Sequence, residues 1–355
     1  MIPYIEGKAY FGKITKQLLH HIPPHSIIII DHEDLDIVAA EDIVRKKVLA
    51  VINRKCSMTG QLPRTGIPLL EKHNIPVFDV DLFRNRKIKK TSYVKIEEKA
   101  LFYLENDSWI KSGRITHYNE SLIAKKREQG TSNFENLYKN FAKNSLDHAS
   151  LELPLFLDAI NELPIYDCMV NKVVFVVARG AGVQNDVQVI KRFMKQMNCI
   201  ILAVDGASTF LYEYQINPDF IIGDMDSIPT NIKAYTTQFI AHSYMDGFSP
   251  GQERLKKLSV ESTSIPFPGM SEDLAIMLAY VSKANHIFTL GCRNSCVELI
   301  EKGRKGMGST ILTRMFAGEK ISDLKEMDKC LHIPKNVQLI EESLWEEHLN
   351  ITEEF

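Results

Sequence analysis

The pattern of hydrophobic and polar positions begins with alternating strand-like and helix-like segments. Residues 26–31 form a short β-branched run that predicts a buried strand, and residues 48–53 and 75–80 predict two more. Apolar residues at helical spacing over 32–45 predict a helix between the first two strands, and 67–73 predicts a helical turn. This order of elements indicates a small α/β layer.

The next stretch changes character. Polar and apolar residues alternate at 93–96, and an apolar run follows at 100–104, which together favour antiparallel strands of a small β unit. Apolar residues then recur every three or four positions over 132–155, which predicts a long helix that joins two domains and ends near Pro154. The apolar stripe of that helix is also a candidate surface for a homodimer.

The last part of the chain repeats strands and helices more regularly. Apolar runs at 173–178 and 199–204 are typical of buried strands, 218–222 predicts a third strand, and helical patterns separate them. A helix over 272–281 and a strand over 286–290 follow. Repeated strand–helix units predict a doubly wound parallel sheet with helices on both faces.

These patterns predict four regions. We expect a smaller N-terminal α/β domain with its β unit, a helical connector, a larger α/β domain with the parallel sheet and a C-terminal tail. Their expected bounds are 1–130, 131–165, 166–320 and 321–355. A chain of 355 residues is long enough for two separate hydrophobic cores.

Composition removes several functional classes. With 43 Lys and Arg against 45 Asp and Glu, the chain lacks the basic excess that a general nucleic-acid-binding protein carries. Its six cysteines are scattered without a Cys-x-x-Cys pair, which argues against a zinc site or a disulfide framework. No apolar stretch approaches the length of a membrane span, and no signal-peptide pattern is present. We therefore expect a soluble, cytoplasmic protein.

Candidate chemistry gathers where the predicted strands of the second domain end. Ligands of parallel α/β sheets bind beyond the carboxyl ends of the strands. Loops beginning at Arg179, Asp205 and Gly223 all follow such strands. We therefore expect their side chains to lie near one another.

The acidic residues in these loops suggest a cation. The Asp-x-Asp arrangement of Asp224 and Asp226 brings two carboxylates near one point, and Mg²⁺ typically takes one or two carboxylates plus phosphate oxygens. Without a cation the two charges would repel. Asp273, at a predicted helix start, is either a further carboxylate of the site or a charge that the helix dipole favours. Asp205 taken alone would usually be a helix cap.

Glycine and basic residues suggest an anion nearby. The stretch 180–182 follows a strand and resembles a phosphate cradle, although it lacks the complete fingerprint of a known phosphate loop. Arg179 and Arg304 could neutralise phosphate charge. The stretch 302–308 interleaves glycine with basic residues, and it is either an anion-binding loop or a basic turn.

Several stretches resemble the catalytic domain of thiamin pyrophosphokinases. They are Asp-Gly-Ala at 205–207, Pro-Asp at 218–219, Gly-Asp-Met-Asp-Ser-Ile at 223–228 and Ser-Glu-Asp-Leu at 271–274. The resemblance implies the fold of that catalytic domain, with a site for Mg²⁺ and ATP.

By position, the resemblance also implies roles for individual residues. Catalytic roles would fall to Asp224, Asp226 and Asp273, and Asp205 would join the first two in holding the metal. The residues that would bind the nucleotide are Arg179, Gly180, Asp205, Gly206, Gly223, Ser227 and Arg304.

The chain to about residue 325 is also similar to the SteA family of cytokinetic-ring proteins. The matching stretches are 30–36, 59–63, 177–180, 246–251 and 301–310. This resemblance implies a protein that binds Mg-ATP or a related phosphorylated ligand and regulates cell division or envelope remodelling through a protein partner. The N-terminal region further resembles a swivelling phosphohistidine domain, but its loop at 57–60 contains no histidine.

The departures from these families leave alternatives open. Thiamin pyrophosphokinases carry Gly-Gly-Arg-x-Asp-His where 291–296 here reads Gly-Cys-Arg-Asn-Ser-Cys, and too few residues follow for their thiamin-binding β-domain. Thiamin is therefore not the expected acceptor. The alternatives are an active diphosphokinase that transfers pyrophosphate from ATP to a non-thiamin alcohol, releasing AMP, or a scaffold with an empty site. An amphipathic pattern at 340–349 fits either a protein partner or a helix that caps its own domain.

Overall fold

A computed structural model describes residues 3–83, 89–228 and 237–327. The chain divides into two compact units. Unit 1 comprises residues 1–157 and 293–312, and unit 2 comprises 158–292 and 313–355. The segment 293–312, which the sequence places within the nucleotide-binding region, therefore groups with the N-terminal unit.

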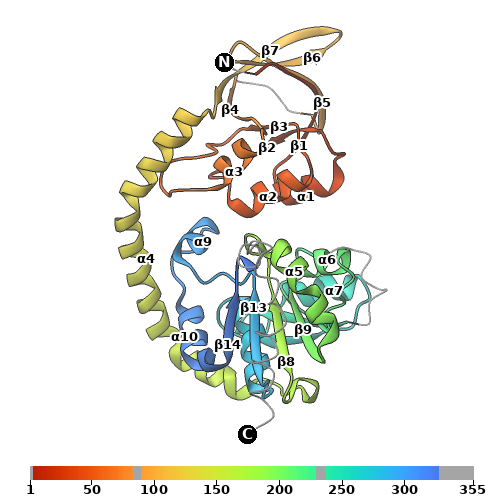
Figure 1. Ribbon diagram of the computed structural model, residues 1–355, viewed down its shortest axis with the longest axis vertical. Coiled ribbons are helices and arrows are strands. Elements are labelled where there is room, and N and C mark those ends of the chain that lie inside the picture. The colour runs from red at the N-terminus through yellow and green to blue at the C-terminus, as the bar shows by residue number, and fades with distance from the viewer. Residues whose placement is uncertain (1–2, 84–88, 229–236, 328–355) are drawn as a thin grey trace, which may run out of the picture. The chain divides into compact units, whose positions relative to one another are not determined.

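Unit 1 is built on a closed seven-stranded barrel (Figure 1). Its strands follow one another around the barrel in the order β1-β2-β3-β4-β7-β6-β5, and β1 to β4 are parallel neighbours. The strands are β1 (Ile5–Gly12), β2 (Ile27–Ile30), β3 (Ala50–Asn53), β4 (Val77–Leu82), β5 (Thr91–Glu97), β6 (Ala100–Glu105) and β7 (Ser108–His117). The helices between the parallel strands are α1 (Thr15–His21), α2 (Ile37–Arg45) and α3 (Gly66–Lys72).

Two hydrophobic cores explain why β2 is four consecutive isoleucines. Successive side chains of a strand point to opposite faces of the sheet. Ile27 and Ile29 pack inside the barrel with Phe78, whereas Ile28 and Ile30 pack under the helices with Leu35. Both faces are covered, so the strand has no polar position.

The antiparallel strands β5 to β7 complete the same sheet. We predicted them as a small β unit, but β7 pairs with β4 and β5 pairs with β1, so they close the barrel. Strand β1 and helix α1 were not predicted, because the sequence of β1 contains two glycines and lacks a regular apolar alternation. The N-terminal α/β layer is thus one part of a barrel rather than a separate layer.

The long helix α4 (Glu120–Glu162) starts earlier and ends later than the pattern predicted. The prediction that it ends near Pro154 is wrong. A proline removes one backbone hydrogen bond, but tertiary packing can hold the helix beyond it. Phe156 and Ala159 are both buried, which keeps the last turns helical.

Unit 2 contains a seven-stranded sheet in the order β12-β11-β10-β9-β8-β13-β14, and all of its pairings are parallel. The strands are β8 (Val173–Val177), β9 (Cys199–Val204), β10 (Phe220–Gly223), β11 (Gln238–Ser243), β12 (Thr263–Pro266), β13 (His286–Leu290) and β14 (Ile321–Leu324). The remaining helices of the chain are η1 (Asp167–Met169), α5 (Val183–Gln196), α6 (Ala207–Glu213), α7 (Pro250–Lys257), α8 (Ser271–Val281), α9 (Cys296–Glu301), α10 (Gly308–Ala317) and η3 (Gly318–Lys320).

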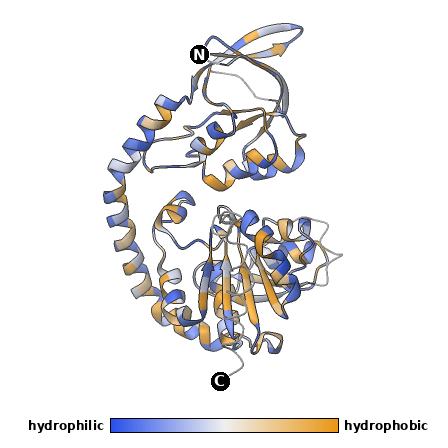
Figure 2. Cartoon of the chain, viewed as in Figure 1, coloured by the Kyte–Doolittle hydropathy of each residue, from blue (hydrophilic) through white to orange (hydrophobic). Residues whose placement is uncertain are grey.

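This architecture confirms the predicted α/β domain with a parallel sheet. The strands of the sheet are largely hydrophobic (Figure 2), as expected when helices cover both faces. Helices α5, α6 and α7 contribute Val187, Leu211 and Leu255 to one core. Helix α8 contacts β8, β9, β10 and β13 and is buried over residues 272–279. Residues 321–324, which the sequence assigned to the tail, form the edge strand β14.

Among the described residues, no helix combines the length and the apolar character that crossing a bilayer requires. The amphipathic pattern at 340–349 lies outside the described residues.

Candidate functional site

The predicted acidic cluster begins where β9 and β10 end side by side. Asp205 directly follows β9, and its backbone N–H donates to Ile222 O in β10 at 2.9 Å. Its carboxylate turns toward the next loop and accepts a hydrogen bond from Met225 N at 3.2 Å. A Cβ atom added to Gly223 would lie 1.7 Å from Asp205 Oδ1. The glycine is therefore required because the Asp205 carboxylate occupies the space of a side chain.

The loop after β10 separates one buried residue from two exposed acids. Met225 is fully buried and has a left-handed backbone with φ of 63°. Asp224 and Asp226 flank it, both are exposed, and Asp226 N donates to Asp224 Oδ1 at 3.1 Å. The Ser227 hydroxyl donates to the Asp226 carboxylate. The buried methionine anchors the loop while the two aspartates face solvent.

The charges in this loop interact unfavourably. Although Asp224 is exposed as a residue, partial burial of its carboxyl group raises its pKa, and the neighbouring charge of Asp226 also raises it. Hydrogen bonds from the Asp226 backbone and with the Asp205 side chain act in the opposite direction. The net effect is a raised pKa for Asp224.

An arginine that the sequence did not single out fixes this loop. Arg254 of α7 donates to Asp226 O at 2.7 Å and to Ile228 O at 2.8 Å. The start of α7 also packs on the loop, because a Cβ atom on Gly251 would lie 2.8 Å from Asp224 O. The stretch 246–251 carries part of the family resemblance, but nothing local indicates that a residue 28 positions away holds the aspartate loop.

A half-buried histidine lies on the neighbouring strand. His242 of β11 contacts Phe267 O through Nε2 at 2.8 Å and Ser271 Oγ through Nδ1 at 3.1 Å. Since a carbonyl can only accept, Nε2 carries the proton and Nδ1 of the neutral ring accepts from Ser271. Burial lowers the pKa of His242, while the charge of Asp224 opposes that shift. The histidine is therefore a neutral neighbour of the acidic loop.

Asp273 has a local structural role. It is almost fully buried in the first turn of α8, where its carboxylate accepts from Met270 N at 3.2 Å. This contact matches the helix-terminus alternative of the sequence analysis. The same first turn holds Ser271, which hydrogen-bonds His242.

After β8 the chain adds strands on one side of the sheet as far as β12, and then adds β13 on the other side of β8. Two glycine-containing loops meet at this switch point between β8 and β13. A Cβ atom on Gly180 would lie 2.4 Å from Gly291 O, and one on Gly291 would lie 2.4 Å from Ala178 O. Gly182, with φ of 72°, precedes α5. Arg179 lies between these glycines and β8. Such a switch point is the usual ligand crevice of an open parallel sheet.

The other predicted residues are placed as follows. Gly206 is buried and precedes α6. Arg304 is exposed and belongs to unit 1, whereas the aspartates belong to unit 2. Gly306 and Gly308, in the same basic stretch, allow close packing on α4, because added Cβ atoms would lie 3.1 Å from Ser145 N and 2.8 Å from Ala149 N.

The donor set suits a hard divalent cation that is only partly bound by protein. Within the described residues, no group of three or more His, Cys, Asp or Glu side chains is arranged to hold a metal ion. Mg²⁺ generally keeps several waters and takes one or two carboxylates together with substrate phosphates. One or two carboxylates from among Asp205, Asp224 and Asp226 would meet that smaller requirement, and their role as metal ligands stays a prediction.

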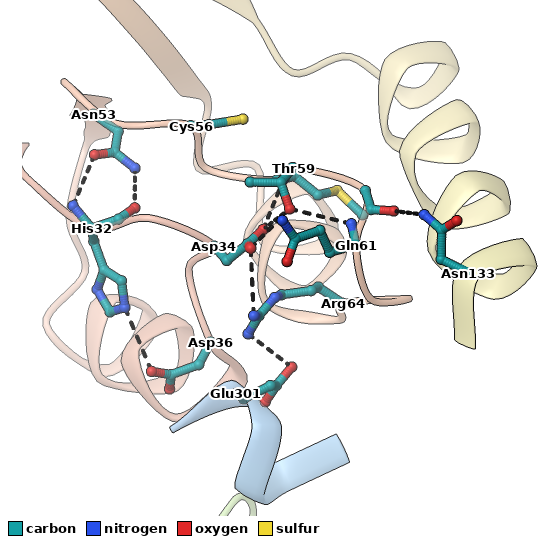
Figure 3. Close-up of polar contacts among 12 residues, drawn as sticks. His32, Asp34, Asp36, Asn53, Cys56, Thr59, Gln61, Arg64, Asn133 and Glu301 are labelled. Carbon is teal, nitrogen blue, oxygen red and sulfur yellow. Dashed lines mark hydrogen bonds and ion pairs between the residues drawn. The ribbon is translucent and has the colours of Figure 1, made fainter. Parts of the chain in front are cut away.

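Unit 1 carries a second polar network at the carboxyl ends of β2 and β3 (Figure 3). The buried guanidinium of Arg64 lies between two carboxylates, with Nη2 3.5 Å from Asp34 Oδ2 and Nη1 3.6 Å from Glu301 Oε1. Asp34 also accepts from Thr59 N at 2.7 Å. Glu301 comes from the segment 293–312, so its contact with Arg64 joins this segment to the barrel.

The same network includes the histidine of the acidic stretch 30–36. His32 Nδ1 lies 3.0 Å from Thr15 Oγ1, and Nε2 lies 3.6 Å from Asp36 Oδ2. Lys302 Nζ approaches the same Asp36 oxygen at 3.2 Å. Although Asp36 is buried, these partners hold its pKa well below its usual range. His32 is thus part of an internal network rather than an isolated surface histidine.

Comparisons with known proteins bear on unit 2. Residues 190–294 match the family described as thiamin pyrophosphokinase, catalytic domain. No curated protein matches the chain. Among solved structures, the chain is similar to a thiamin pyrophosphokinase from Geobacillus thermodenitrificans at 16% sequence identity and a TM-score of 0.27, over 42% of this chain and 58% of that one.

The family match confirms the predicted thiamin pyrophosphokinase-like domain. The chain spans little more than half the length of the solved relative, and that likeness adds nothing to the family match. The SteA resemblance stays a prediction.

Proposed function

We propose that unit 2 binds Mg²⁺ together with a nucleoside polyphosphate at the carboxyl ends of β9 and β10. ATP is the first candidate for this ligand. The observation that carries the proposal is that the loops after β9 and β10 meet: the Asp205 carboxylate accepts from Met225 N, and the Asp224 carboxylate accepts from Asp226 N. Burial and the like charge of Asp226 raise the pKa of Asp224. A divalent cation bound with phosphate would relieve that repulsion.

The metal would supply charge neutralisation for the phosphates. The chain's own groups have separate tasks in the proposal. Gly223 leaves room for the Asp205 carboxylate, and Arg254 holds the loop that presents the two aspartates. Arg179, Gly180, Gly206 and Ser227 are assigned to the nucleotide by sequence position. Arg304 belongs to unit 1, and its assignment to the nucleotide stays a prediction from the sequence.

The alternative is an active diphosphokinase, and the match of residues 190–294 to a catalytic domain favours it. An alcohol oxygen would attack the β-phosphorus of ATP, the bond from that phosphorus to the bridging oxygen of AMP would break, and the alcohol proton would leave to solvent. Asp224, Asp226 and Asp273 would be the catalytic residues. Release of AMP that requires an added alcohol would establish this activity, and ATP binding without such release would leave a binding protein.

Regulation through a protein partner is the biological role that the SteA resemblance suggests. In this proposal, the bound nucleotide alters how a partner recognises the chain. A pull-down of candidate partners with and without Mg-ATP tests it. Binding that is indifferent both to nucleotide and to Asp224→Asn would support the scaffold alternative instead.

The decisive experiment is calorimetric titration of ATP, with and without Mg²⁺. We expect saturable, Mg-dependent binding to the wild type and its loss in Asp226→Asn. Asp167→Asn is the matched control, because Asp167 is an exposed acid of the same unit and the charge change is identical. Absence of ATP binding to the folded wild type would overturn the proposal.

A further inference from the structure

An exposed aromatic loop follows β11, next to the acidic cluster. Tyr244 is 64% exposed and Phe248 is 50% exposed, and Met245 between them is also exposed. Large apolar side chains gathered on a surface usually mark a binding site rather than a part of the core. The loop is therefore a candidate for contact with a ligand.

Hydrogen bonds hold this loop in one conformation. Tyr244 N donates to Phe248 O at 3.0 Å, and Gly247 N donates to Tyr244 O at 2.9 Å. The Asp246 carboxylate accepts from Phe248 N at 2.9 Å. Ser249, which follows directly, caps α7 by accepting from Gln252 N. The aromatic side chains are thus carried on a tight turn that leads into a helix.

The two rings present parallel faces. Their planes differ by 10°, and their centroids are 6.3 Å apart. A third flat ring could therefore stack against either face in the same orientation. Parallel stacking is an ordinary arrangement of two rings, and here it leaves flat, exposed apolar faces on which a planar ligand could stack.

The loop is close to the proposed phosphate site. Strand β11 pairs with β10 in register, with Ala241 opposite Gly223, and Tyr244 comes three residues later. Gly251, at the start of α7, packs against the backbone of Asp224. A ligand whose phosphates lie at the aspartates would have its remaining parts within reach of this turn.

We propose that Tyr244 and Phe248 form a stacking platform for the base of the nucleotide bound at the acidic cluster. The inference rests on the proposed function and names the part of the ligand that these residues recognise. Stacking of a base on an aromatic side chain tolerates every base, because each has a flat π-face. The platform would therefore add affinity for nucleotides over inorganic polyphosphates without selecting one base strictly.

The test compares Mg-ATP with Mg-tripolyphosphate, which has no base. We expect the wild type to bind ATP more tightly than tripolyphosphate. Tyr244→Ala or Phe248→Ala should weaken the binding of ATP by about tenfold. Binding of tripolyphosphate should not change in either variant. Tyr138→Ala is the control, since Tyr138 is an exposed tyrosine of α4 in the other unit.

A spectroscopic variant gives an independent signal. Tyr244→Trp keeps an aromatic face, so its ATP affinity should stay near that of the wild type. Its added emission, measured against the two native tryptophans, should be quenched by ATP and not by tripolyphosphate.

The outcomes separate the two proposals. If both ligands bind the wild type and neither alanine variant loses ATP affinity, the platform is wrong while the phosphate site stands. If neither ligand binds the folded wild type, both proposals fail.

Discussion

The carboxylate of Asp205 occupies the space that a side chain at Gly223 would need: an added Cβ atom would lie 1.7 Å from its Oδ1 atom. The two residues end neighbouring strands, so their contact couples the sequence of one loop to the geometry of the next. Gly223→Ala should therefore displace the Asp205 carboxylate and destabilise unit 2 by about 2–4 kcal/mol. Chemical unfolding measures the loss, and calorimetry with Mg-ATP should show weaker binding.

Two further variants isolate this contact. Gly318→Ala should be nearly neutral, because no atom lies near its added Cβ and its backbone is not left-handed. Adding Asp205→Ala to Gly223→Ala removes the clash, so stability should recover in part, because the φ of 156° at position 223 still strains an alanine; ligand binding should not return. If the double variant stays as unstable as Gly223→Ala, the clash is not the cause.

Arg254 should be irreplaceable by lysine. Its two terminal nitrogens hold Asp226 O and Ile228 O at once, and a lysine ammonium cannot reproduce that fork. We expect Arg254→Lys and Arg254→Ala to weaken Mg-ATP binding by similar factors and to cost about 1–3 kcal/mol of stability. Lys257→Ala, at the exposed end of the same helix, is the control. Wild-type affinity of the lysine variant in the binding assay would show that charge alone matters.

Gly291 packs closely against the backbone of Ala178 at the switch point, so replacing it with alanine should strongly destabilise the protein. Its φ is 64°, and an added Cβ atom would lie 2.4 Å from Ala178 O. Gly291→Ala should cost at least about 2 kcal/mol, from left-handed strain and steric clash together. Gly182→Ala carries only the strain, since its φ is 72° and no atom lies near its Cβ, so about 1 kcal/mol is expected. If thermal unfolding showed that Gly291→Ala and Gly182→Ala lose the same stability, the steric clash at Gly291 would be contradicted.

Much of unit 2 can be predicted from the sequence, because β8, β9 and β10 are short runs without charged residues. The rule that ligands meet the carboxyl ends of parallel strands is enough to place Asp205 close to Gly223. The role of Arg254 cannot be predicted in this way, because its contacts with the aspartate loop depend on where α7 packs. The aromatic turn after β11 stands out in the sequence only as a family motif.

The fold of unit 1 is harder to predict from the sequence, and the reason is physical. The barrel closes through β1 and β5, which are far apart in sequence, and no local pattern encodes that pairing. The ion pair of Arg64 and Glu301 joins residues still farther apart. The helix end predicted at Pro154 is wrong, because the burial of Phe156 and Ala159 stabilises the helix by more than the lost backbone hydrogen bond costs.

The Arg64–Glu301 pair predicts a pH dependence of stability. Burial raises the pKa of Glu301 to about 7, although the charge of Arg64 opposes the shift. An unfolded glutamate ionises near pH 4.3, so between about pH 4.3 and 7 the folded state binds more protons than the unfolded state. Stability from this residue is therefore full at low pH and lost as the pH rises through about 7.

Glu301→Gln should remove that loss, because the amide stays neutral at every pH. Relative to wild type, the variant should unfold with a similar free energy at pH 5 and be more stable at pH 8, by as much as about 3 kcal/mol. Glu71→Gln is the control, since Glu71 is an exposed residue of α3 and should show no such divergence. Asp36, whose pKa is lowered, loses its stabilising effect only on stronger acidification, so it does not affect the comparison between pH 5 and 8. A Glu301→Gln variant less stable than wild type at pH 8 would show that the attraction of Arg64 outweighs the cost of burying the carboxylate.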